Sequence, residues 1–154
     1  MVKSMKIIID TREQTPLLFE SFKDVEIERG TLKTGDYALF GAENKICIER
    51  KSTSDFLGSI TQGRARFERE LERMQAFEFR YVLIEQSIEA ILLHAVIHTR
   101  IYPNSIIGTM VAWEARWGVH FWALPDRKTM EQFIYRIFLN YIKNEKKKES
   151  KYDF

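Results

Sequence analysis

Cysteine is almost absent from this 154-residue sequence, which contains only Cys47. A disulfide framework is therefore excluded, and the fold must be held by an apolar core, for which 45% hydrophobic residues are sufficient. Cys47 stands between Ile46 and Ile48, where a thiol packs as a small hydrophobic side chain. This usage is typical of a reducing, cytoplasmic environment.

Long apolar runs are also lacking. The N-terminal segment reaches acidic residues after only three isoleucines, which is too short for the core of a signal peptide. No other stretch approaches the roughly 20 apolar residues that a membrane-spanning helix needs. We therefore expect a soluble, intracellular protein, and a prokaryotic or phage origin fits this expectation.

A strong excess of charge of one sign is missing too. The 24 lysines and arginines are balanced by 22 acids, so the net charge of +2 does not by itself indicate a polyanionic partner. His94, His98 and His120 lack any cysteine at metal-ligand spacing, so no zinc site is predicted. Any indication of function must come from where the charges are placed.

The hydrophobic pattern alternates between strand and helix periods along the chain, without repeats or an internal linker. Short apolar or alternating runs predict strands at Lys6–Asp10, Val25–Arg29, Tyr37–Phe40, Lys45–Glu49, Arg80–Glu85 and Val119–Leu124. Helical spacing predicts helices after Ser52, from Gly63 to Phe77, from Ile88 to Ala95, from Pro103 to Trp117 and after Asp126. The sequence thus predicts one α/β domain over residues 1–145, with a mixed central sheet flanked by helices, and a charged C-terminal tail over 146–154.

Acidic and basic side chains gather at the two central strands, which the short loop at Gly41 to Asn44 predicts to be a hairpin. Asp36 opens one strand and Glu49 lies near the end of the other, so antiparallel pairing brings both acids to one edge of the sheet. Lys51 lies two residues after Glu49, and residues two apart on a strand share a face. Carboxylates that hold Mg²⁺ or Mn²⁺ beside an ammonium group suit phosphodiester hydrolysis.

Four motifs occur in order around this hairpin: DTRE (Asp10–Glu13), GDY (Gly35–Tyr37), ERKxxxD (Glu49–Asp55) and GR (Gly63–Arg64). The set resembles the nuclease domain of the XPF family of structure-specific endonucleases, which has the PD-(D/E)xK restriction-endonuclease-like fold. The resemblance runs from about Ile7 to Glu85 and is looser beyond. XPF relatives usually carry a tandem helix-hairpin-helix module, for which 154 residues leave no room.

The resemblance implies a role for each acid and base of these motifs. Asp36 and Glu49 would be the primary metal ligands, with the Arg50 carbonyl as a third. Asp10 and Glu13 would bind a second metal ion or position water, and Lys51 would orient water or stabilise negative charge. The implied catalytic residues are Asp10, Asp36, Glu49, Lys51 and Asp55. The arginines implied to bind substrate phosphates are Arg12, Arg50 and Arg64.

Each motif residue also has a purely structural interpretation. Asp55, three residues after Ser52, has the spacing of a helix capping box, and Asp36 after Gly35 is typical of a turn. Arg12 and Glu13 can form a surface ion pair. The arginines and glutamates from Arg64 to Arg73 are typical of a solvated helix face, on which only Arg64 is given a functional role. Trp113, Trp117, Phe121 and Trp122 can stack on bases, but their spacing favours core packing or a subunit interface.

Taken together, these features predict a Mg²⁺- or Mn²⁺-dependent DNA endonuclease that cuts branched or single-strand-containing DNA in repair or recombination. The resemblance also implies a homodimer, formed through the aromatic C-terminal half. Two alternatives remain open. One is a catalytically silent DNA-binding or scaffolding subunit, and the other is a nuclease domain that depends on a separate DNA-binding partner.

Overall fold

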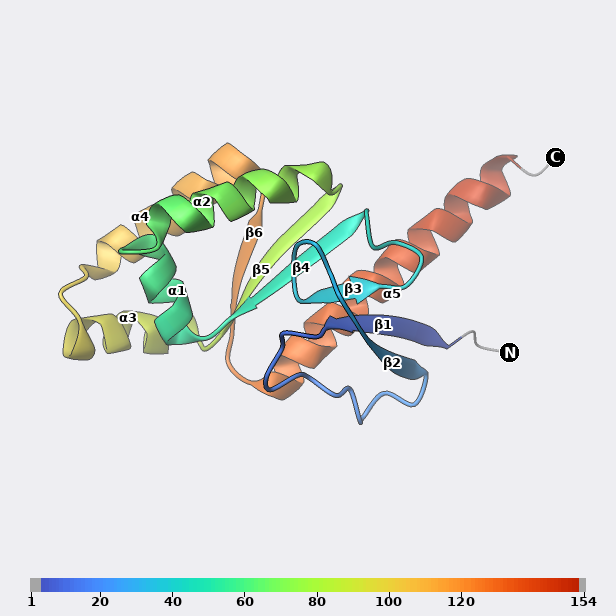
Figure 1. Ribbon diagram of the computed structural model, residues 1–154, viewed down its shortest axis with the longest axis horizontal. Coiled ribbons are helices and arrows are strands. Elements are labelled where there is room, and N and C mark those ends of the chain that lie inside the picture. The colour runs from blue at the N-terminus through green and yellow to red at the C-terminus, as the bar shows by residue number, and fades with distance from the viewer. Residues whose placement is uncertain (1–3, 153–154) are drawn as a thin grey trace.

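The computed structural model describes residues 4–152, which form a mixed six-stranded sheet with helices on both faces (Figure 1). The strands lie in the order β2 (Val25–Gly30), β1 (Met5–Asp10), β3 (Tyr37–Leu39), β4 (Ile46–Lys51), β5 (Phe79–Glu85) and β6 (His120–Leu124). β3 is antiparallel to both of its neighbours, whereas β1–β2 and β4–β5–β6 are parallel. The predicted α/β architecture is confirmed.

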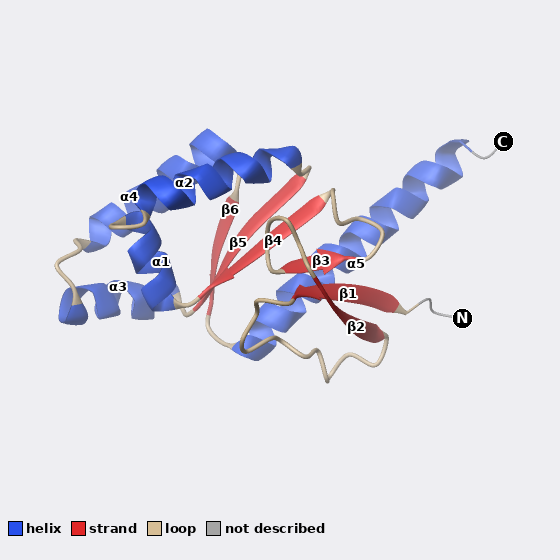
Figure 2. Cartoon of the chain, in the orientation of Figure 1, coloured by secondary structure: helices blue, strands red, loops and turns tan. Residues whose placement is uncertain are grey.

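Within residues 4–152, five α-helices cover the sheet, and Figure 2 distinguishes them from the strands by colour. They are α1 (Thr53–Ile60), α2 (Arg64–Arg73), α3 (Ile88–His98), α4 (Pro103–Trp117) and α5 (Arg127–Tyr152), with a short 3₁₀ turn, η1 (Met74–Ala76), after α2. The helices α1, α2, α3 and α4 pack on one face of the sheet through one cluster of buried side chains. The helix α5 packs on the opposite face through a second cluster. Among residues 4–152, no helix is long and apolar enough to cross a membrane.

The helix ends follow the predicted chemistry. Ser52 precedes α1, and its hydroxyl accepts a hydrogen bond from the main-chain N–H of Asp55, which satisfies one of the free donors at the start of the helix. Gly118 ends α4 in the left-handed conformation, with φ of 61°, which glycine adopts without the steric cost that other residues incur. The carboxylate of Asp126 accepts from the N–H of Thr129 at the start of α5.

Most observed strands begin or end one residue from the predicted boundaries, and α3 continues to His98 rather than ending at Ala95. Two further differences concern the site and the tail. β4 runs from Ile46 to Lys51 rather than from Lys45 to Glu49, because parallel pairing with β5 continues to the Lys51–Ile84 pair. The charged segment from 146 to 152 continues the α5 helix, and the remaining tail residues, 153 and 154, lie outside the described part. Figure 1 shows that the C-terminal turns of α5 extend past the sheet.

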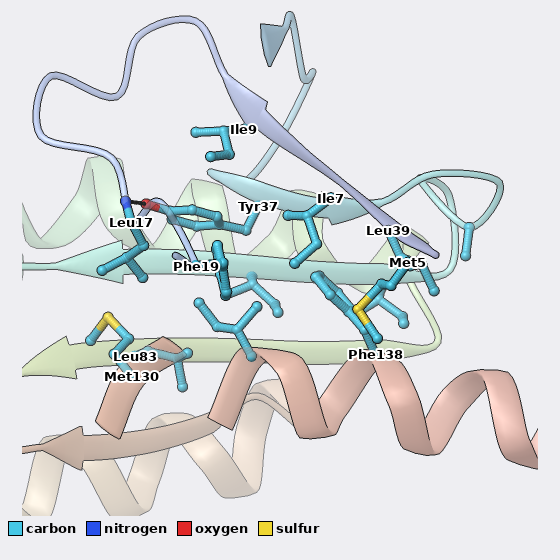
Figure 3. Close-up of a cluster of buried hydrophobic side chains, with 14 of the residues drawn as sticks. Met5, Ile7, Ile9, Leu17, Phe19, Tyr37, Leu39, Leu83, Met130 and Phe138 are labelled. Carbon is cyan, nitrogen blue, oxygen red and sulfur yellow. Dashed lines mark hydrogen bonds between the residues drawn. The ribbon is translucent and has the colours of Figure 1, made fainter. Parts of the chain in front are cut away.

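The core beneath α5 anchors the loop that carries the first motif (Figure 3). Tyr37 of the GDY motif is fully buried there, and its hydroxyl accepts a hydrogen bond of 2.8 Å from the N–H of Leu17. The same hydroxyl donates to Glu13 at 2.8 Å. A buried tyrosine normally finds polar partners for its hydroxyl. Tyr37 thus ties the loop after β1 to the strand that follows Asp36.

Candidate active site

The hairpin of β3 and β4 places the two predicted metal ligands beside each other. The main-chain N–H of Asp36 donates to the carbonyl of Ile48 at 2.8 Å, and the Asp36 carboxylate accepts from the N–H of Arg50, also at 2.8 Å. Asp36 is therefore fixed against the segment of β4 that contains Glu49. The expectation that antiparallel pairing brings the two acids together agrees with this geometry.

Gly35 makes this close approach possible. Its φ is 88°, and a Cβ atom at this position would lie 2.9 Å from the Cys47 sulfur and 3.1 Å from the Ile48 carbonyl oxygen. Any larger residue would push the Asp36 segment away from β4. Cys47 is buried, as its apolar sequence context predicts, and burial raises the pKa of its thiol above the usual range.

Lys51 shares a face of β4 with Glu49, as the strand period requires. Its Nζ atom lies 3.9 Å from Glu49 Oε1 and 4.6 Å from the centroid of the Phe67 ring of α2. Both polar side chains are mostly buried. The ammonium group is held by an ion pair on one side and an aromatic ring on the other, which fixes its direction.

Burial and mutual repulsion make the acids of this site hard to ionise. Burial raises the pKa of Asp36 to about 7, although the hydrogen bond from Arg50 opposes the shift, and the charge of Glu70 adds to it. Burial also raises the pKa of Glu49 well above its usual range, and Asp36 and Glu70 reinforce this effect. Lys51 compensates for only part of the negative charge, so a bound cation would relieve the repulsion.

Glu70 was not singled out by the sequence, because α2 reads there as a solvated helix face. Its carboxyl group lies close enough to Asp36 and Glu49 for its charge to raise the pKa of both acids. The sequence feature that could have indicated this role is the position of Glu70 in α2. It lies three residues after Phe67 and one before Leu71, the two buried residues of that helix. It therefore stands at the border of the apolar stripe, where a side chain can turn inward.

A cavity of about 700 Å³ opens between α1 and α2 next to these groups. Asp55 lines this cavity and is exposed. Its position is compatible both with a place in the first turn of α1 and with contact to a ligand. Arg66, which the sequence also assigned to the solvated face, lines the same cavity. The lining residues are Lys51, Ser54, Asp55, Gly58, Ser59, Gln62, Gly63, Arg66, Phe67 and Glu70. The polar lining is suited to a phosphate-bearing ligand.

Asp10 and Glu13, the predicted additional acids, are engaged in contacts of their own. Asp10 is fully buried and accepts hydrogen bonds from Arg12 Nε at 2.7 Å and from the N–H of Leu32 at 2.9 Å. Burial alone would raise its pKa, but these bonds hold it below the usual range. Glu13 Oε2 lies 3.0 Å from Arg50 Nη1. Both acids brace the DTRE loop, and their role as metal ligands stays a prediction.

The three predicted phosphate-binding arginines differ in what they contact. Arg12 is largely exposed beside Asp10. The Arg50 side chain is only 9% exposed and bridges Glu13 and Glu85. The Arg64 guanidinium donates to Thr109 of α4 and stacks over Trp113 at 5.0 Å. Arg50 and Arg64 therefore hold elements together in this structure. Arg12 also donates to Asp10 and to the Leu32 carbonyl, but most of its side chain is exposed to solvent.

The donor set fits a hard divalent cation. No group of three or more His, Cys, Asp or Glu side chains within residues 4–152 is already arranged around a metal position. Mg²⁺, however, keeps several of its own waters and is commonly held by only one or two carboxylates. Asp36 and Glu49 are two such carboxylates, and both are destabilised as anions by their surroundings.

The ERCC4 domain family model matches residues 9–137, a range that contains all four motifs. The chain belongs to the ERCC4 domain family. The resemblance to XPF-type nuclease domains is thereby confirmed.

Individual relatives of this ERCC4 domain agree with the assignment. The chain is 41% identical over 61 residues to the DNA repair endonuclease XPF of Cricetulus griseus, a match that covers 38% of this chain and 6% of that protein. It is 36% identical over 63 residues to a putative ATP-dependent RNA helicase, MJ1505, of Methanocaldococcus jannaschii, covering 40% of this chain and 8% of that protein. The ERCC4 domain thus spans only a small part of these relatives.

Solved structures show the same fold. XPF from Aeropyrum pernix is 26% identical to the ERCC4 domain, with a TM-score of 0.68 over 84% of this chain and 57% of that chain. A structure of A. pernix XPF in complex with DNA gives a TM-score of 0.70 at 23% identity, over 91% of this chain and 66% of that chain. The restriction-endonuclease-like mixed sheet expected from the motifs is the fold observed.

Proposed function

We propose that this ERCC4 domain is a metal-dependent endonuclease that hydrolyses phosphodiester bonds in DNA. The observation that carries the proposal is the convergence of Asp36, Glu49 and Lys51 at one edge of the β3–β4 hairpin, beside a polar cavity. Membership of the ERCC4 family and the likeness to XPF, which has been solved in complex with DNA, support DNA as the substrate.

Each group of the site has a part in this chemistry. Asp36 and Glu49 would hold a divalent cation, Mg²⁺ or Mn²⁺, and Glu70 would add to the negative charge around it. The bound cation supplies charge neutralisation of the phosphate and lowers the pKa of water. Lys51, fixed by Glu49 and Phe67, stabilises the charge that develops on the phosphate oxygens. Arg66 and Arg12 bind flanking phosphates.

The expected products are a 3′-hydroxyl and a 5′-phosphate, as in the superfamily that the motifs resemble. The expected substrates are branched or single-strand-containing DNA, with a role in repair or recombination. The net charge of only +2 is compatible with a separate DNA-binding protein as a source of additional specificity.

Homodimerisation is part of the proposal, and the structure offers a suitable surface on α3 and α4. Large apolar side chains are exposed there, including Val96 at 61%. They are Leu93, Val96, Ile97, Tyr102, Ile107 and Val111. Because none of them is charged, the same patch on a second copy can meet it across a two-fold axis. Sedimentation of the wild type and of Val96→Glu tests this: a dimer that the substitution leaves intact would contradict the surface chosen.

The test of activity uses labelled duplex, single-stranded, flap and fork DNA, incubated with the protein in Mg²⁺, in Mn²⁺ or in EDTA. We expect cleavage of at least one single-strand-containing substrate in either metal and none in EDTA. A protein that binds DNA but cuts none of these substrates in either metal would instead be a catalytically silent subunit.

A further inference from the structure

A second cavity lies on the opposite face of the sheet from the acidic site. It measures about 690 Å³ and is bounded by β5, β6 and α5. Ile46 belongs to the core cluster beneath α5, and Tyr81, Trp122 and Tyr141 pack against that cluster. Phe67 of the acidic site belongs instead to the cluster on the other face. The second cavity begins at Ile46, five residues before Lys51 on β4, a separation of about 17 Å in an extended strand. The catalytic proposal makes no use of this groove.

The floor of the groove is made of aromatic rings that remain partly open. Phe79 and Phe133 are 37% and 38% exposed. Trp122 contacts two other aromatic rings: its ring centroid is 5.3 Å from that of Phe133 and 5.2 Å from that of Tyr81. At the other end of the groove, Phe79 meets Tyr141 at 6.0 Å. Aromatic rings left open in a concave surface offer π-faces on which other rings can stack.

One wall of the groove is basic. Arg136, Lys143, Lys147 and Lys151 recur along α5 at intervals of seven, four and four residues, which places them on one side of the helix. None of these four forms an ion pair within residues 4–152. Glu145, the sole acid among the lining residues, is already paired with Lys148.

We propose that this groove binds a single-stranded segment of nucleic acid, with bases stacked on the aromatic floor and phosphates along the basic side of α5. Open aromatic rings beside a row of cations are the combination that single-strand-binding surfaces use, because every base has a face to stack and every linkage a charge. Duplex DNA does not fit this floor, since its bases are already stacked within the helix. This inference rests on the proposed nuclease function in one respect only: the bound single strand would be an unpaired arm of the nuclease's DNA substrate.

A second copy of this chain is a less suitable occupant. In a two-fold interface centred on the groove, the same patch lies on both subunits, so the four cations of one α5 would approach the four of the other. The uncharged surface on α3 and α4 does not have this difficulty. Charge complementarity therefore favours a polyanion.

The experiment measures binding of a fluorescent oligothymidine of about 12 nucleotides, within the usual site size, in EDTA so that no cleavage occurs. Lys147→Glu with Lys151→Glu reverses two charges in the groove. The matched control is Lys146→Glu with Lys128→Glu, which has the same net charge on the same helix but lies outside the groove. Phe133→Ala removes one stacking surface. Circular dichroism verifies that each variant is folded.

We expect the groove pair to raise Kd about tenfold or more and to lower the salt slope by about 1.4, from about 0.7 for each lysine removed. Phe133→Ala is expected to raise Kd by about fivefold or more. The change in log Kd caused by the control pair should be less than about half of the change caused by the groove pair. Groove variants that bind as the wild type does would overturn the proposal. So would a control pair that binds as weakly as the groove pair, or groove variants that lose self-association and keep their affinity for DNA.

Cleavage of flap DNA in Mg²⁺, measured in parallel, separates the two proposals. If the wild type cuts nothing but the groove variants weaken oligonucleotide binding as expected, the nuclease proposal fails and the groove assignment stands. If the wild type cuts but all variants bind equally well, the groove assignment alone fails.

Discussion

Replacing Asp36 with asparagine should stabilise the metal-free protein, although it removes a central residue of the site. Burial raises the pKa of Asp36 from 3.8 to about 7, so the folded state keeps this proton at a pH at which the unfolded state has released it. The folded state then binds more protons than the unfolded state between these values, and stability falls as pH rises from about 4 to about 7. Asparagine has no charge to bury, and its amide oxygen can still accept the hydrogen bond from Arg50.

The size of the effect follows from the shift. Three pKa units correspond to about 4 kcal/mol above pH 7, because each unit is worth about 1.36 kcal/mol, and most of this cost develops above about pH 5. We therefore expect the stability advantage of Asp36→Asn to grow by about 2 to 3 kcal/mol between about pH 5 and about pH 8. Urea unfolding in EDTA at both pH values measures it. Glu26→Gln, at an exposed position on the edge strand β2, is the control.

An advantage that stays constant with pH, or a variant less stable than the wild type near pH 8, would refute the account of a buried, uncompensated carboxylate. Addition of Mg²⁺ provides a second readout. It should stabilise the wild type more at high pH, where the acids have lost their protons to solvent and can bind the cation, and should stabilise Asp36→Asn much less.

Further predictions concern the side chains around the site. Arg50→Met should lower the unfolding free energy by about 2 to 3 kcal/mol in urea titrations, less than for a fully buried pair, because it removes the cation that bridges the partly buried carboxylates of Glu13 and Glu85. Adding Glu13→Gln and Glu85→Gln to that variant should restore part of the loss, and a further loss would contradict the bridge. Asp10→Asn should cost about 1 to 3 kcal/mol by weakening charge-assisted hydrogen bonds. A loss of about a hundredfold in its cleavage rate at saturating metal would support the predicted role of Asp10 in the reaction, and a rate within about threefold of the wild type would contradict it. Glu70→Gln should weaken Mn²⁺ binding, measured calorimetrically, by about tenfold, and an unchanged affinity would exclude Glu70 from the metal environment.

The sequence predicts those parts of the site that depend on local order. Asp36, Glu49 and Lys51 could be placed together because a hairpin and the two-residue period of a strand are short-range features. The cap at Ser52 and the end of α4 at Gly118 are local for the same reason. Motif order then supplied the family, which a family model over residues 9–137 confirms.

What the sequence could not predict depends on contacts between distant elements. The position of Glu70 beside Leu71 places it at the border of the apolar stripe of α2, but Glu68 beside Phe67 stands at that border too. Which of the two acids faces the site depends on how α2 packs on the sheet. The internal use of Arg50 depends on Glu85, which lies 35 residues away on β5. A local sequence pattern indicates a phosphate ligand at this arginine but carries no information about its partners across the sheet.

The most direct test of the central claim is the single-turnover cleavage rate of flap DNA in Mg²⁺ for Glu49→Gln and for the control Glu26→Gln, each at saturating protein. The account predicts that Glu49→Gln binds the DNA but cuts at least about a thousandfold more slowly than the wild type, a loss of about 4 kcal/mol of transition-state stabilisation. The control is expected to cut at the wild-type rate. Cleavage by Glu49→Gln at close to the wild-type rate would show that the reaction does not take place at the β3–β4 hairpin.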